Sequence, residues 1–301
     1  MISVVVPTAE MSGRLESRLG SARIQVWRLG AAEPFPGPVD LLVLPYMLPA
    51  PELARLSGLP VRIAQSQTLG YDGIHDHLPA GVVYCNAVGV HEGSTAELAV
   101  ALALATLRGI PKAVRDAGQS RWDHQRQPGL AGRRIVLLGV GGVGREVLRR
   151  LAPFDVTVEL VARTPRAGVH GIDELPGLLP DADVVIVAIP LSASTRQLVD
   201  ADFLAAMKPG ALLVNVSRGG VVDTDALVDA LREERVRAAL DVTDPEPLPP
   251  DHPLWTLPGV VITPHLGGDT DAMDVRIDAI IEEQVRRIGT GEAPLNAVSA
   301  P

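Results

Sequence analysis

Hydrophobic positions in the first ninety residues form short runs, separated by turn-rich or helical segments. The runs are rich in β-branched residues and leucine, and they occupy residues 3–6, 24–27, 41–44, 61–64 and 82–84. Such runs are typical of strands in a parallel sheet whose two faces are both covered. This part of the chain therefore predicts an α/β domain.

A second alternation begins at Ile135. Its apolar runs occupy residues 135–138, 156–161, 184–189, 211–216, 237–242 and 260–263. Six runs with helices between them match a Rossmann-type doubly wound parallel sheet, whose binding crevice lies at the carboxyl ends of the strands. We predict a second α/β domain here.

Helical patterns connect and follow the two alternations. Ser94 and Glu97 have the spacing of a capping box, which predicts a helix from there to about Leu107. Residues 116–132 are polar and interrupted by glycine and proline, as in a loop, and residues 271–288 have helical spacing. The last helix would return to the first domain, so we predict one domain from 1–93 plus 270–301 and another from 94–269.

The first run of the second alternation leads into a glycine motif. Gly139, Gly141 and Gly144 follow an apolar strand and open a helical segment. Their order suits a tight turn, a close approach of a pyrophosphate to the backbone, and close packing of helix on strand. Because a helix N-terminus presents free N–H groups, this segment predicts a dinucleotide site.

Three strands of the second alternation end in residues that carry acid–base or anion-binding chemistry. Arg218, Glu246 and His265 follow the runs that end at residues 216, 242 and 263. Parallel neighbouring strands would bring all three to one sheet edge. Arginine pairs with a carboxylate, histidine transfers a proton near neutral pH, and a carboxylate orients the histidine. Taken singly, each residue also has a structural explanation. Arg218 could cap a strand end, Glu246 could be a loop charge, and His265 could be a buried histidine bonded to backbone.

Composition narrows the class of protein. The net charge is −9 without a long basic run, which argues against nucleic acid or an anionic membrane as partner. One cysteine, Cys85, excludes an intrachain disulfide and fits a reducing cytoplasm. The N-terminus lacks the pattern of a signal peptide, and the apolar part of residues 97–107 is too short to span a bilayer. We expect a cytoplasmic protein.

Four ordered motifs resemble those of the D-isomer-specific 2-hydroxyacid dehydrogenase family, in particular its glyoxylate/hydroxypyruvate reductase members. They are the glycine motif at 139–144 and the arginine, glutamate and histidine motifs at 215–223, 240–248 and 263–268. The likeness covers nearly the whole chain. It implies a Rossmann-type cofactor domain at 94–269 and a discontinuous flavodoxin-like α/β substrate domain at 1–93 plus 270–301. It also implies a homodimer formed through residues 94–120.

The resemblance also implies roles for individual residues. Arg218 would bind the substrate carboxylate and carbonyl, His265 would be the acid–base group, and Glu246 its partner. The residues implied in substrate binding are Arg218 together with the first-domain loop of Leu69, Gly70 and Tyr71. The residues expected to bind the cofactor are Gly139, Gly141, Gly142, Val143, Gly144, Arg163, Thr164, Pro190, Ser217 and Asp241.

The remaining histidines receive structural roles. His252 lies in a loop that resembles a structural loop of the family. His75, His77 and His91 lack the surroundings of metal ligands, and we interpret them as surface or loop residues. No metal site is predicted.

The choice of cofactor rests on the second strand of the predicted nucleotide fold. An acidic residue at its end bonds the ribose hydroxyls of NAD, whereas an arginine accommodates the 2′-phosphate of NADP. Here that position is Ala162, followed by Arg163 and Thr164, while Glu159 falls in mid-strand. The sequence favours NADP(H) and leaves NAD(H) possible.

A preference for NADPH suggests reduction of a 2-keto acid such as glyoxylate or hydroxypyruvate to the D-2-hydroxy acid. Two alternatives stay open. Phosphoglycerate oxidation would want a positive side chain near the first-domain loop, where residues 65–70 offer none and Ser66 stands. A non-catalytic, dinucleotide-sensing interaction protein could keep the same fold.

Overall fold

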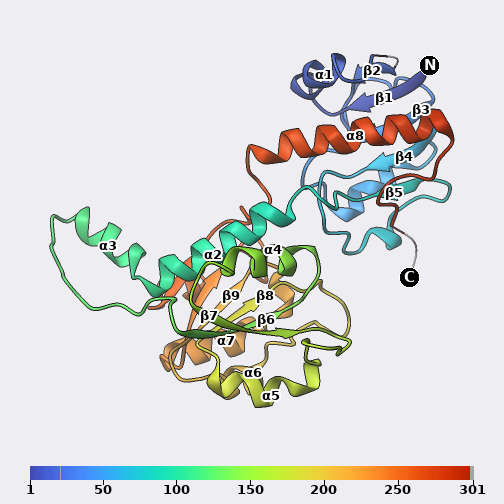
Figure 1. Ribbon diagram of the computed structural model, residues 1–301. Coiled ribbons are helices and arrows are strands. Elements are labelled where there is room, and N and C mark those ends of the chain that lie inside the picture. Colours follow the sequence, from blue (N-terminus) through green and yellow to red (C-terminus); the bar gives the residue numbers. More distant parts are fainter. Residues whose placement is uncertain (21, 299–301) are drawn as a thin grey trace. The chain divides into compact units, whose positions relative to one another are not determined.

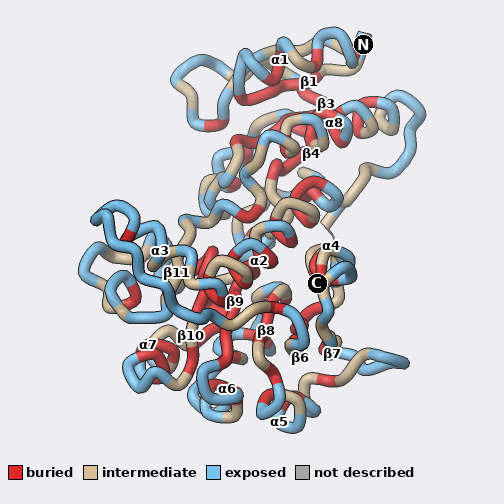
Figure 2. The backbone as a smooth tube through the Cα atoms, turned by 60° about the vertical axis from the view of Figure 1, so that its left-hand side comes forward, coloured by how far each residue is buried: buried red, intermediate tan, exposed pale blue. Residues whose placement is uncertain are grey.

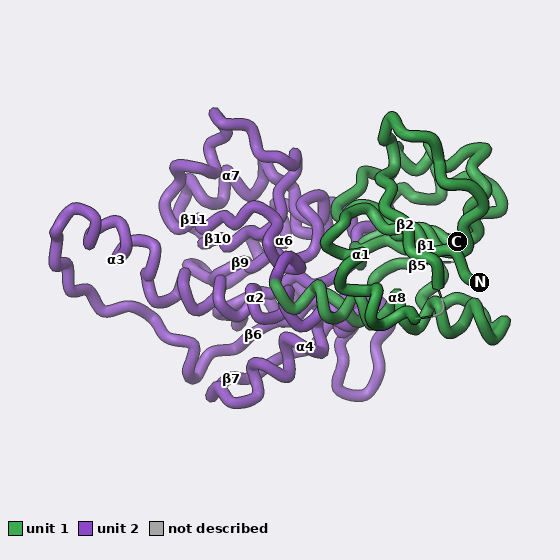
Figure 3. Tube along the Cα trace, turned by 90° about the horizontal axis from the view of Figure 1, so that it is seen from above, with its two compact units in different colours: residues 1–91, 271–301 green, residues 92–270 purple. Residues whose placement is uncertain are grey.

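The apolar runs form parallel strands in two separate sheets in a computed structural model, which describes residues 1–20 and 22–298 (Figure 1). The chain divides into two units, residues 1–91 with 271–301 and residues 92–270 (Figure 3). The predicted boundaries at 93/94 and 269/270 lie within two residues of these divisions. Of the predicted C-terminal segment, residues 299–301 lie outside the described part of the chain.

Unit 1 contains a five-stranded sheet with the strand order β2-β1-β3-β4-β5, in which every pairing is parallel. This is the flavodoxin-like order. The strands are β1 (Ile2–Val6), β2 (Ala22–Val26), β3 (Val39–Val43), β4 (Val61–Gln65) and β5 (Val83–Cys85). The helices are α1 (Ala9–Glu16) and α8 (Ala272–Thr290), with the 3-10 helices η1 (Ala50–Leu56) and η2 (Ile74–Asp76).

Both faces of the sheet of unit 1 are covered, as the continuous apolar runs of its strands predict. Side chains alternate along β1, so Val4 and Val6 pack with α1 and α8 while Val5 packs with residues of η1 on the other face. The long returning helix α8 buries Ile277 and Ile281 against this sheet. An ion pair of Arg14 on α1 with Asp278 on α8, at 2.9 Å, joins the first and last helices of the unit. The predicted return of the C-terminal helix is therefore correct.

Unit 2 contains a six-stranded parallel sheet with the order β11-β10-β9-β8-β6-β7. The strands are β6 (Arg133–Leu138), β7 (Val156–Val161), β8 (Val184–Val187), β9 (Ala211–Asn215), β10 (Val236–Leu240) and β11 (Val260–Ile262). The α-helices are α2 (Glu92–Leu107), α3 (Ile110–Ala117), α4 (Gly142–Leu151), α5 (Leu175–Leu178), α6 (Ala201–Ala206) and α7 (Thr224–Arg232). The 3-10 helices are η3 (Ile172–Glu174), η4 (Leu179–Asp181), η5 (Gly219–Val221) and η6 (Pro253–Trp255).

Helices cover both faces of this second sheet too. On β8, Val184 and Ile186 pack with α2 and α4, whereas Val185 and Val187 pack with α5, α6 and α7. The strands of the sheet accordingly form the buried centre of the unit (Figure 2). Strand order reverses at β6, which lies between β7 and β8, and the crevice beside such a switch point is where doubly wound sheets bind ligands.

Two local predictions differ from the structure. Helix α2 begins at Glu92, so Ser94 lies inside the helix and its hydroxyl is paired with Thr270 Oγ1 at 2.9 Å instead of capping. The predicted capping box is wrong because a tertiary partner uses the hydroxyl. The segment before the predicted loop also contains the short helix α3, which stands away from the sheet of its unit (Figures 1 and 3).

Candidate active site

The glycine motif forms a tight turn between β6 and α4. Gly139 has φ of +109°, and a Cβ there would lie 2.3 Å from the carbonyl oxygen of Ala188. A Cβ on Gly144 would lie 1.9 Å from the carbonyl oxygen of Gly139. Neither position can hold a side chain, because in each case backbone occupies the space. These two glycines bring helix, turn and neighbouring strand into contact, as the spacing predicts.

Gly141 has a different environment. It precedes the first residue of α4, and a Cβ there would meet no atom within 4 Å. The helix N-terminus therefore faces open space at this point, and its N–H groups and the positive end of the helix dipole are directed to it. A pyrophosphate fits such a cradle. Val143 is a partly buried residue of α4 that packs against the adjacent core.

A buried acidic residue, which the sequence did not indicate, lies beside the same turn. Glu92 is 9% exposed, and a Cβ on Gly142 would lie 2.7 Å from its Cγ. The absence of a side chain on Gly142 thus leaves room for Glu92, on the first turn of α2, to pack against the first turn of α4. The part of Gly142 in cofactor binding stays a prediction.

The end of β7 presents the residues expected to select the cofactor. Arg163 and Thr164 are exposed and follow Ala162, whose N–H donates to His170 O at 3.0 Å. Glu159 is paired with Arg134 on β6, 3.1 Å between Oε1 and Nη2, and with His170. The carboxylate of Glu159 is therefore engaged by partners on β6 and on the segment that pairs with the end of β7.

Arg218 follows β9 in a turn organised by a buried amide. Asn215 Oδ1 accepts hydrogen bonds from the N–H and the hydroxyl of Ser217, at 3.0 and 2.8 Å, and its Nδ2 donates to Arg218 O at 3.0 Å. Asn215 is wholly buried. The side chain of Asn215 thus fixes the backbone of both Ser217 and Arg218. The sequence indicated Asn215 only as a member of the arginine motif.

Asp241 organises the loop that carries His265. Its carboxylate accepts hydrogen bonds from Thr263 Oγ1 at 2.6 Å and from the N–H groups of Leu266 and Gly267, both at 2.8 Å. Its carbonyl oxygen accepts from the N–H of His265 at 2.8 Å. The side chain is 2% exposed, so most of its accepting capacity is directed into this loop.

His265 and Glu246 form a hydrogen-bonded pair at the same strand ends. His265 Nδ1 lies 2.5 Å from Glu246 Oε1, and the side chains are 28% and 37% exposed. Burial by itself would raise the pKa of Glu246, but the hydrogen bond and charge of His265, with the more distant charge of Arg218, lower it below its ordinary value. Glu246 is therefore an anion at neutral pH, placed to stabilise a protonated imidazole.

The edge of the second sheet thus gathers most of the predicted residues. Arg218, Asp241 and His265 follow β9, β10 and β11, and the glycine turn follows β6 at the same carboxyl edge. Pro190 follows β8, and its carbonyl oxygen accepts from Thr195 Oγ1 at 2.8 Å. The structure places the residues predicted to act in catalysis and in cofactor binding at one edge of this sheet.

The first-domain loop lies in unit 1, after β4. The carbonyl groups of Leu69 and Gly70 accept hydrogen bonds from Asn86 Nδ2 and Thr68 Oγ1. Among the described residues, no acceptor is found for the N–H groups of Leu69, Gly70 and Tyr71. A run of backbone N–H groups of this kind is suited to an anion.

Two histidines have local structural roles. His91 is 5% exposed, with Nε2 2.5 Å from the carbonyl oxygen of Gln67, so of the two expectations, surface or loop, it is a loop residue and a buried one. It fixes the segment that leads into the first-domain loop. His252 Nδ1 accepts a hydrogen bond from the N–H of Leu254 at the start of η6, in keeping with a structural role.

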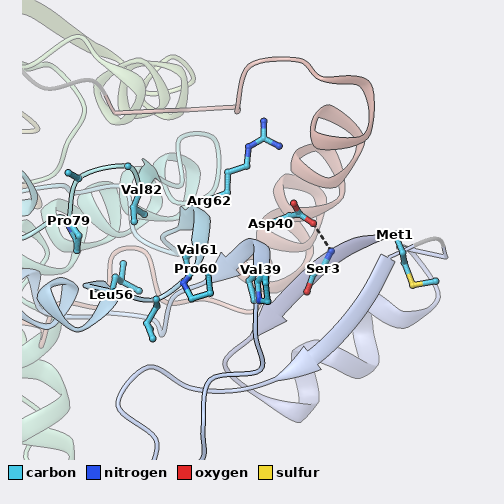
Figure 4. A pocket seen from close by; sticks show the side chains of 15 residues that line it. Met1, Ser3, Val39, Asp40, Leu56, Pro60, Val61, Arg62, Pro79 and Val82 are labelled. Carbon is cyan, nitrogen blue, oxygen red and sulfur yellow. Dashed lines mark hydrogen bonds between the residues drawn. The ribbon is translucent and has the colours of Figure 1, made fainter.

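Cavities elsewhere do not include the predicted site residues. One of about 670 Å³ lies in unit 1 at the amino ends of β1, β3, β4 and β5, the opposite edge from the first-domain loop (Figure 4). Its charged lining residues are Asp40 and Arg62, and the Asp40 carboxylate accepts a hydrogen bond from the N–H of Ser3 at 2.9 Å. In the described part of the chain, no group of three possible metal ligands occurs, and no helix is long and apolar enough to cross a membrane.

A glycine-lined helix N-terminus and an arginine, histidine and carboxylate at one edge of a doubly wound sheet define the class of dinucleotide-dependent oxidoreductases. Residues 100–267 match the model of the D-isomer specific 2-hydroxyacid dehydrogenase, NAD binding domain. Since this match spans more than half of the sequence, the chain belongs to the D-isomer specific 2-hydroxyacid dehydrogenase family, whose members are NAD(P)-dependent oxidoreductases.

Individual relatives agree with this assignment. The mouse glyoxylate reductase/hydroxypyruvate reductase is 36% identical over 233 residues, 73% of this chain and 71% of that protein. The D-3-phosphoglycerate dehydrogenase of Methanocaldococcus jannaschii is 35% identical over 232 residues, which cover 73% of this chain but only 44% of that longer protein.

A solved structure extends the likeness to nearly the whole chain. The NADPH-dependent glyoxylate/hydroxypyruvate reductase of Sinorhizobium meliloti, in complex with citrate, superposes with a TM-score of 0.84 at 30% identity. The superposition covers 99% of this chain and 98% of that one. The two-domain α/β fold predicted from the sequence is confirmed.

Proposed function

We propose that this protein reduces a small 2-keto acid to its D-2-hydroxy acid with NADPH. The observation that carries the proposal is the contact of His265 with an ionised Glu246, at the sheet edge that also holds Arg218 and the glycine cradle. This set supplies a proton donor, a fixed anion beside it and a cation for a carboxylate. Relatives named as glyoxylate and hydroxypyruvate reductases support the substrate class.

The cofactor's phosphates would rest on the N-terminus of α4, where Gly141 leaves room and Gly139 and Gly144 hold the turn closed. Bound there, NADPH supplies the hydride for the keto carbon. Arg163 and Thr164, exposed after β7, would bind its 2′-phosphate. The remaining cofactor contacts that we propose come from Gly142, Val143, Pro190, Ser217 and Asp241.

The chain's own residues provide the proton and orient the acid. His265 donates a proton to the keto oxygen, and the anionic Glu246, in contact with Nδ1, holds the orientation of the ring. Arg218 pairs with the substrate carboxylate and polarises the keto group through its planar guanidinium. In the first domain, the N–H groups of Leu69, Gly70 and Tyr71 would add hydrogen bonds to an anionic substrate.

Phosphoglycerate oxidation is the second candidate, because the archaeal relative carries that name. That substrate presents a phosphate, which calls for a basic side chain near the first-domain loop. Ser66 there is 5% exposed and its hydroxyl is bound to Thr68 Oγ1 at 2.9 Å. Residues 65–70 include no lysine or arginine, so this loop favours a small, unphosphorylated keto acid.

Two further proposals concern the setting of the enzyme. A homodimer formed through residues 94–120 is favoured by the exposure of Ile110 and Val114 on α3, at 51% and 65%. A cytoplasmic location is favoured by the buried, unpaired Cys85, whose pKa burial raises to about 11 and whose thiol is correspondingly unreactive.

The function is tested by initial rates of nicotinamide oxidation with NADPH and NADH in parallel. The substrates are glyoxylate, hydroxypyruvate, pyruvate and phenylpyruvate, with D-3-phosphoglycerate and oxidised cofactor in the reverse direction. We expect turnover of a 2-keto acid with NADPH preferred. Activity confined to phosphoglycerate would establish the second candidate, and cofactor binding without any turnover would favour the dinucleotide-sensing alternative.

Arg163→Ala, with Arg166→Ala as the matched control, tests the cofactor choice separately. Loss of a charge-assisted contact to the 2′-phosphate should weaken NADPH binding by about tenfold or more and leave NADH unchanged. An equal loss for both cofactors would remove Arg163 from this role while leaving the enzyme assignment intact.

A further inference from the structure

The amino-terminal edge of the second sheet carries a small charged cavity that the proposed reaction does not use. It has a volume of about 110 Å³ and lies where β6, β8, β9 and β10 begin, beside Leu107 at the end of α2. The glycine turn and His265 follow the carboxyl ends of these parallel strands. The cavity is therefore at the opposite edge of the sheet from the candidate active site.

Three cationic side chains line this cavity together with a single carboxylate. The cations are Arg133, Lys208 and Arg237, and the anion is Asp183. Asp183 Oδ1 lies 2.8 Å from Lys208 Nζ and 3.0 Å from Arg133 Nη1, while the backbone N–H of Arg134 donates to Oδ2 at 3.0 Å. Burial alone would raise the pKa of Asp183, but these partners lower it, so the carboxylate is ionised at neutral pH.

One carboxylate shared by two cations leaves the third unmatched. Arg237, the second residue of β10, donates from Nε to Gly210 O at 3.2 Å and has no ion pair with any carboxylate in the described residues. Its stem packs beside Gly259, where a Cβ would lie 3.0 Å from Arg237 Cγ. Burial, and then repulsion by Arg133, lower the pKa of Arg237. The cavity wall thus holds a partly desolvated arginine beside a second cation.

The helix end at this cavity does not balance the excess. α2 ends at Leu107, and a helix C-terminus contributes only about half a negative charge. About one and a half positive charges then remain around the cavity, an excess that a bound dianion would relieve. A guanidinium group can donate two parallel hydrogen bonds to two oxygens of one phosphate. The volume of about 110 Å³ suits a phosphate group and not a whole nucleotide.

We propose that this cavity, bounded by Arg133, Asp183, Lys208 and Arg237, is a binding site for a phosphate dianion, either free or as the phosphate of a small monoester. The site is separate from the cofactor's phosphate cradle, because it lies at the other edge of the sheet. The proposal does not depend on the keto acid reductase activity.

The test is isothermal titration calorimetry of the full chain with inorganic phosphate, methyl phosphate and malonate, at fixed ionic strength in a buffer without phosphate. We expect phosphate to bind at one such site per chain. Arg237→Gln should weaken it by about tenfold or more, as expected for loss of a charge-assisted hydrogen bond. The matched control is Arg232→Gln, an exposed arginine paired only within α7, and it should bind as the wild type does.

Other variants separate the possible outcomes. Phosphate binding that is kept in Arg163→Gln and lost in Arg237→Gln lies at the amino edge, as we propose. Binding that is kept in Arg237→Gln, whether or not Arg163→Gln weakens it, would overturn the proposal. Absence of phosphate binding, or malonate binding tighter than phosphate, would also overturn it. If methyl phosphate binds as tightly as inorganic phosphate, the site accepts the phosphate of a monoester as well as the free ion. Should Arg237→Gln fail to fold by circular dichroism, Lys208→Gln replaces it with the same expectation.

Discussion

Several polar side chains of the candidate site act on the backbone of their neighbours. Asn215 fixes the turn that carries Arg218, and Asp241 ties the loop of His265 through three hydrogen bonds. Because hydrogen-bonded carboxylates and amides are costly to disrupt when buried, these two residues restrict where the reactive side chains can lie.

His265 itself has a strained backbone. Its φ is +55°, in the left-handed region that few non-glycine residues adopt, although asparagine, aspartate and histidine are enriched among those that do. The hydrogen bond from its N–H to Asp241 O compensates part of this cost.

Asparagine tolerates the left-handed region, so His265→Asn should preserve the loop and remove only the acid–base group. We expect turnover of the keto acid to fall by about 10²–10⁴-fold, the usual contribution of a general acid, with cofactor affinity unchanged. The measurements are kcat from NADPH oxidation and cofactor binding by fluorescence. His124→Asn, an exposed loop histidine, is the control, and turnover close to wild type in the His265 variant would exclude this residue from the mechanism.

Glu246→Gln tests the ionised partner through the pH dependence of the rate. The pKa of Glu246 is lowered, so the carboxylate is charged across the neutral range and lost only as the pH falls through that lowered value. The wild-type rate should therefore decline on the acid side as Glu246 takes up a proton, whereas glutamine takes up none. In the variant kcat/KM for reduction should be lower and this acid-side decline should be absent.

A pH profile of the Glu246 variant that superposes on that of the wild type would contradict this electrostatic role. A lower rate with an unshifted profile would instead assign Glu246 to orientation of the ring alone. Asp251→Asn, which removes a carboxylate from the loop after Glu246, controls for the general change in charge.

At the scale of elements, the turn between β6 and α4 decides whether the nucleotide cradle exists. Its glycines are required for two different reasons: Gly139 and Gly144 because backbone fills the space of a side chain, and Gly141 because the space must stay open. The two kinds of glycine can therefore be tested separately, one for its effect on stability and the other for its effect on cofactor binding.

Gly144→Ala and Gly141→Ala form a matched pair within one helix N-terminus. A Cβ on Gly144 collides with the carbonyl oxygen of Gly139 at 1.9 Å, so this variant should lose stability by several kcal/mol, as overpacked sites do. Gly141→Ala should keep the wild-type melting temperature but bind cofactor more weakly, because its methyl group enters the cradle. Thermal melts and cofactor titrations measure both, and a Gly141 variant with unaltered affinity would place the pyrophosphate elsewhere.

Helix α2 shows how a tertiary contact can override a local signal. Ser94 and Glu97 have the sequence of a capping box, yet the helix starts at Glu92, whose side chain packs against the turn at Gly142. The hydroxyl of Ser94 instead meets Thr270, 176 residues away. No local pattern contains that partner.

At the scale of the whole molecule, the exposed arm formed by α3 and the loop after it is the clearest surface for a second copy. Val114 is 65% exposed and Trp122 is 98% exposed. Apolar side chains grouped at one segment are typical of an interaction surface. The proposed dimer through residues 94–120 would cover part of this arm.

Val114→Glu tests the dimer, with Val275→Glu on α8 as the control for an equally exposed helical valine. Light scattering coupled to size exclusion should give a dimer for the wild type and the control, and a monomer for the Val114 variant, because a buried unpaired carboxylate is costly. A wild-type protein that is monomeric at micromolar concentration would refute the proposal, as would a Val114 variant that remains dimeric.

The sequence by itself determined the features that depend on local periodicity and on short-range spacing. The apolar runs gave the eleven strands, since a doubly covered parallel strand is hydrophobic on both faces. The order of the runs and the glycine motif indicated two α/β folds and one nucleotide turn. The strand-end rule then brought Arg218, Glu246 and His265 to a single edge, because parallel strands share the direction of their carboxyl ends.

Only the tertiary structure decided features that depend on partners distant in the sequence. The left-handed His265, the burial of His91, the start of α2 and the cation excess at the amino edge each involve atoms brought together by folding. Asp241 is one case: its motif implies cofactor binding, whereas its carboxylate in the fold is bound to Thr263, Leu266 and Gly267. Burial and hydrogen bonding are properties of the packed chain, so residue spacing alone does not specify them.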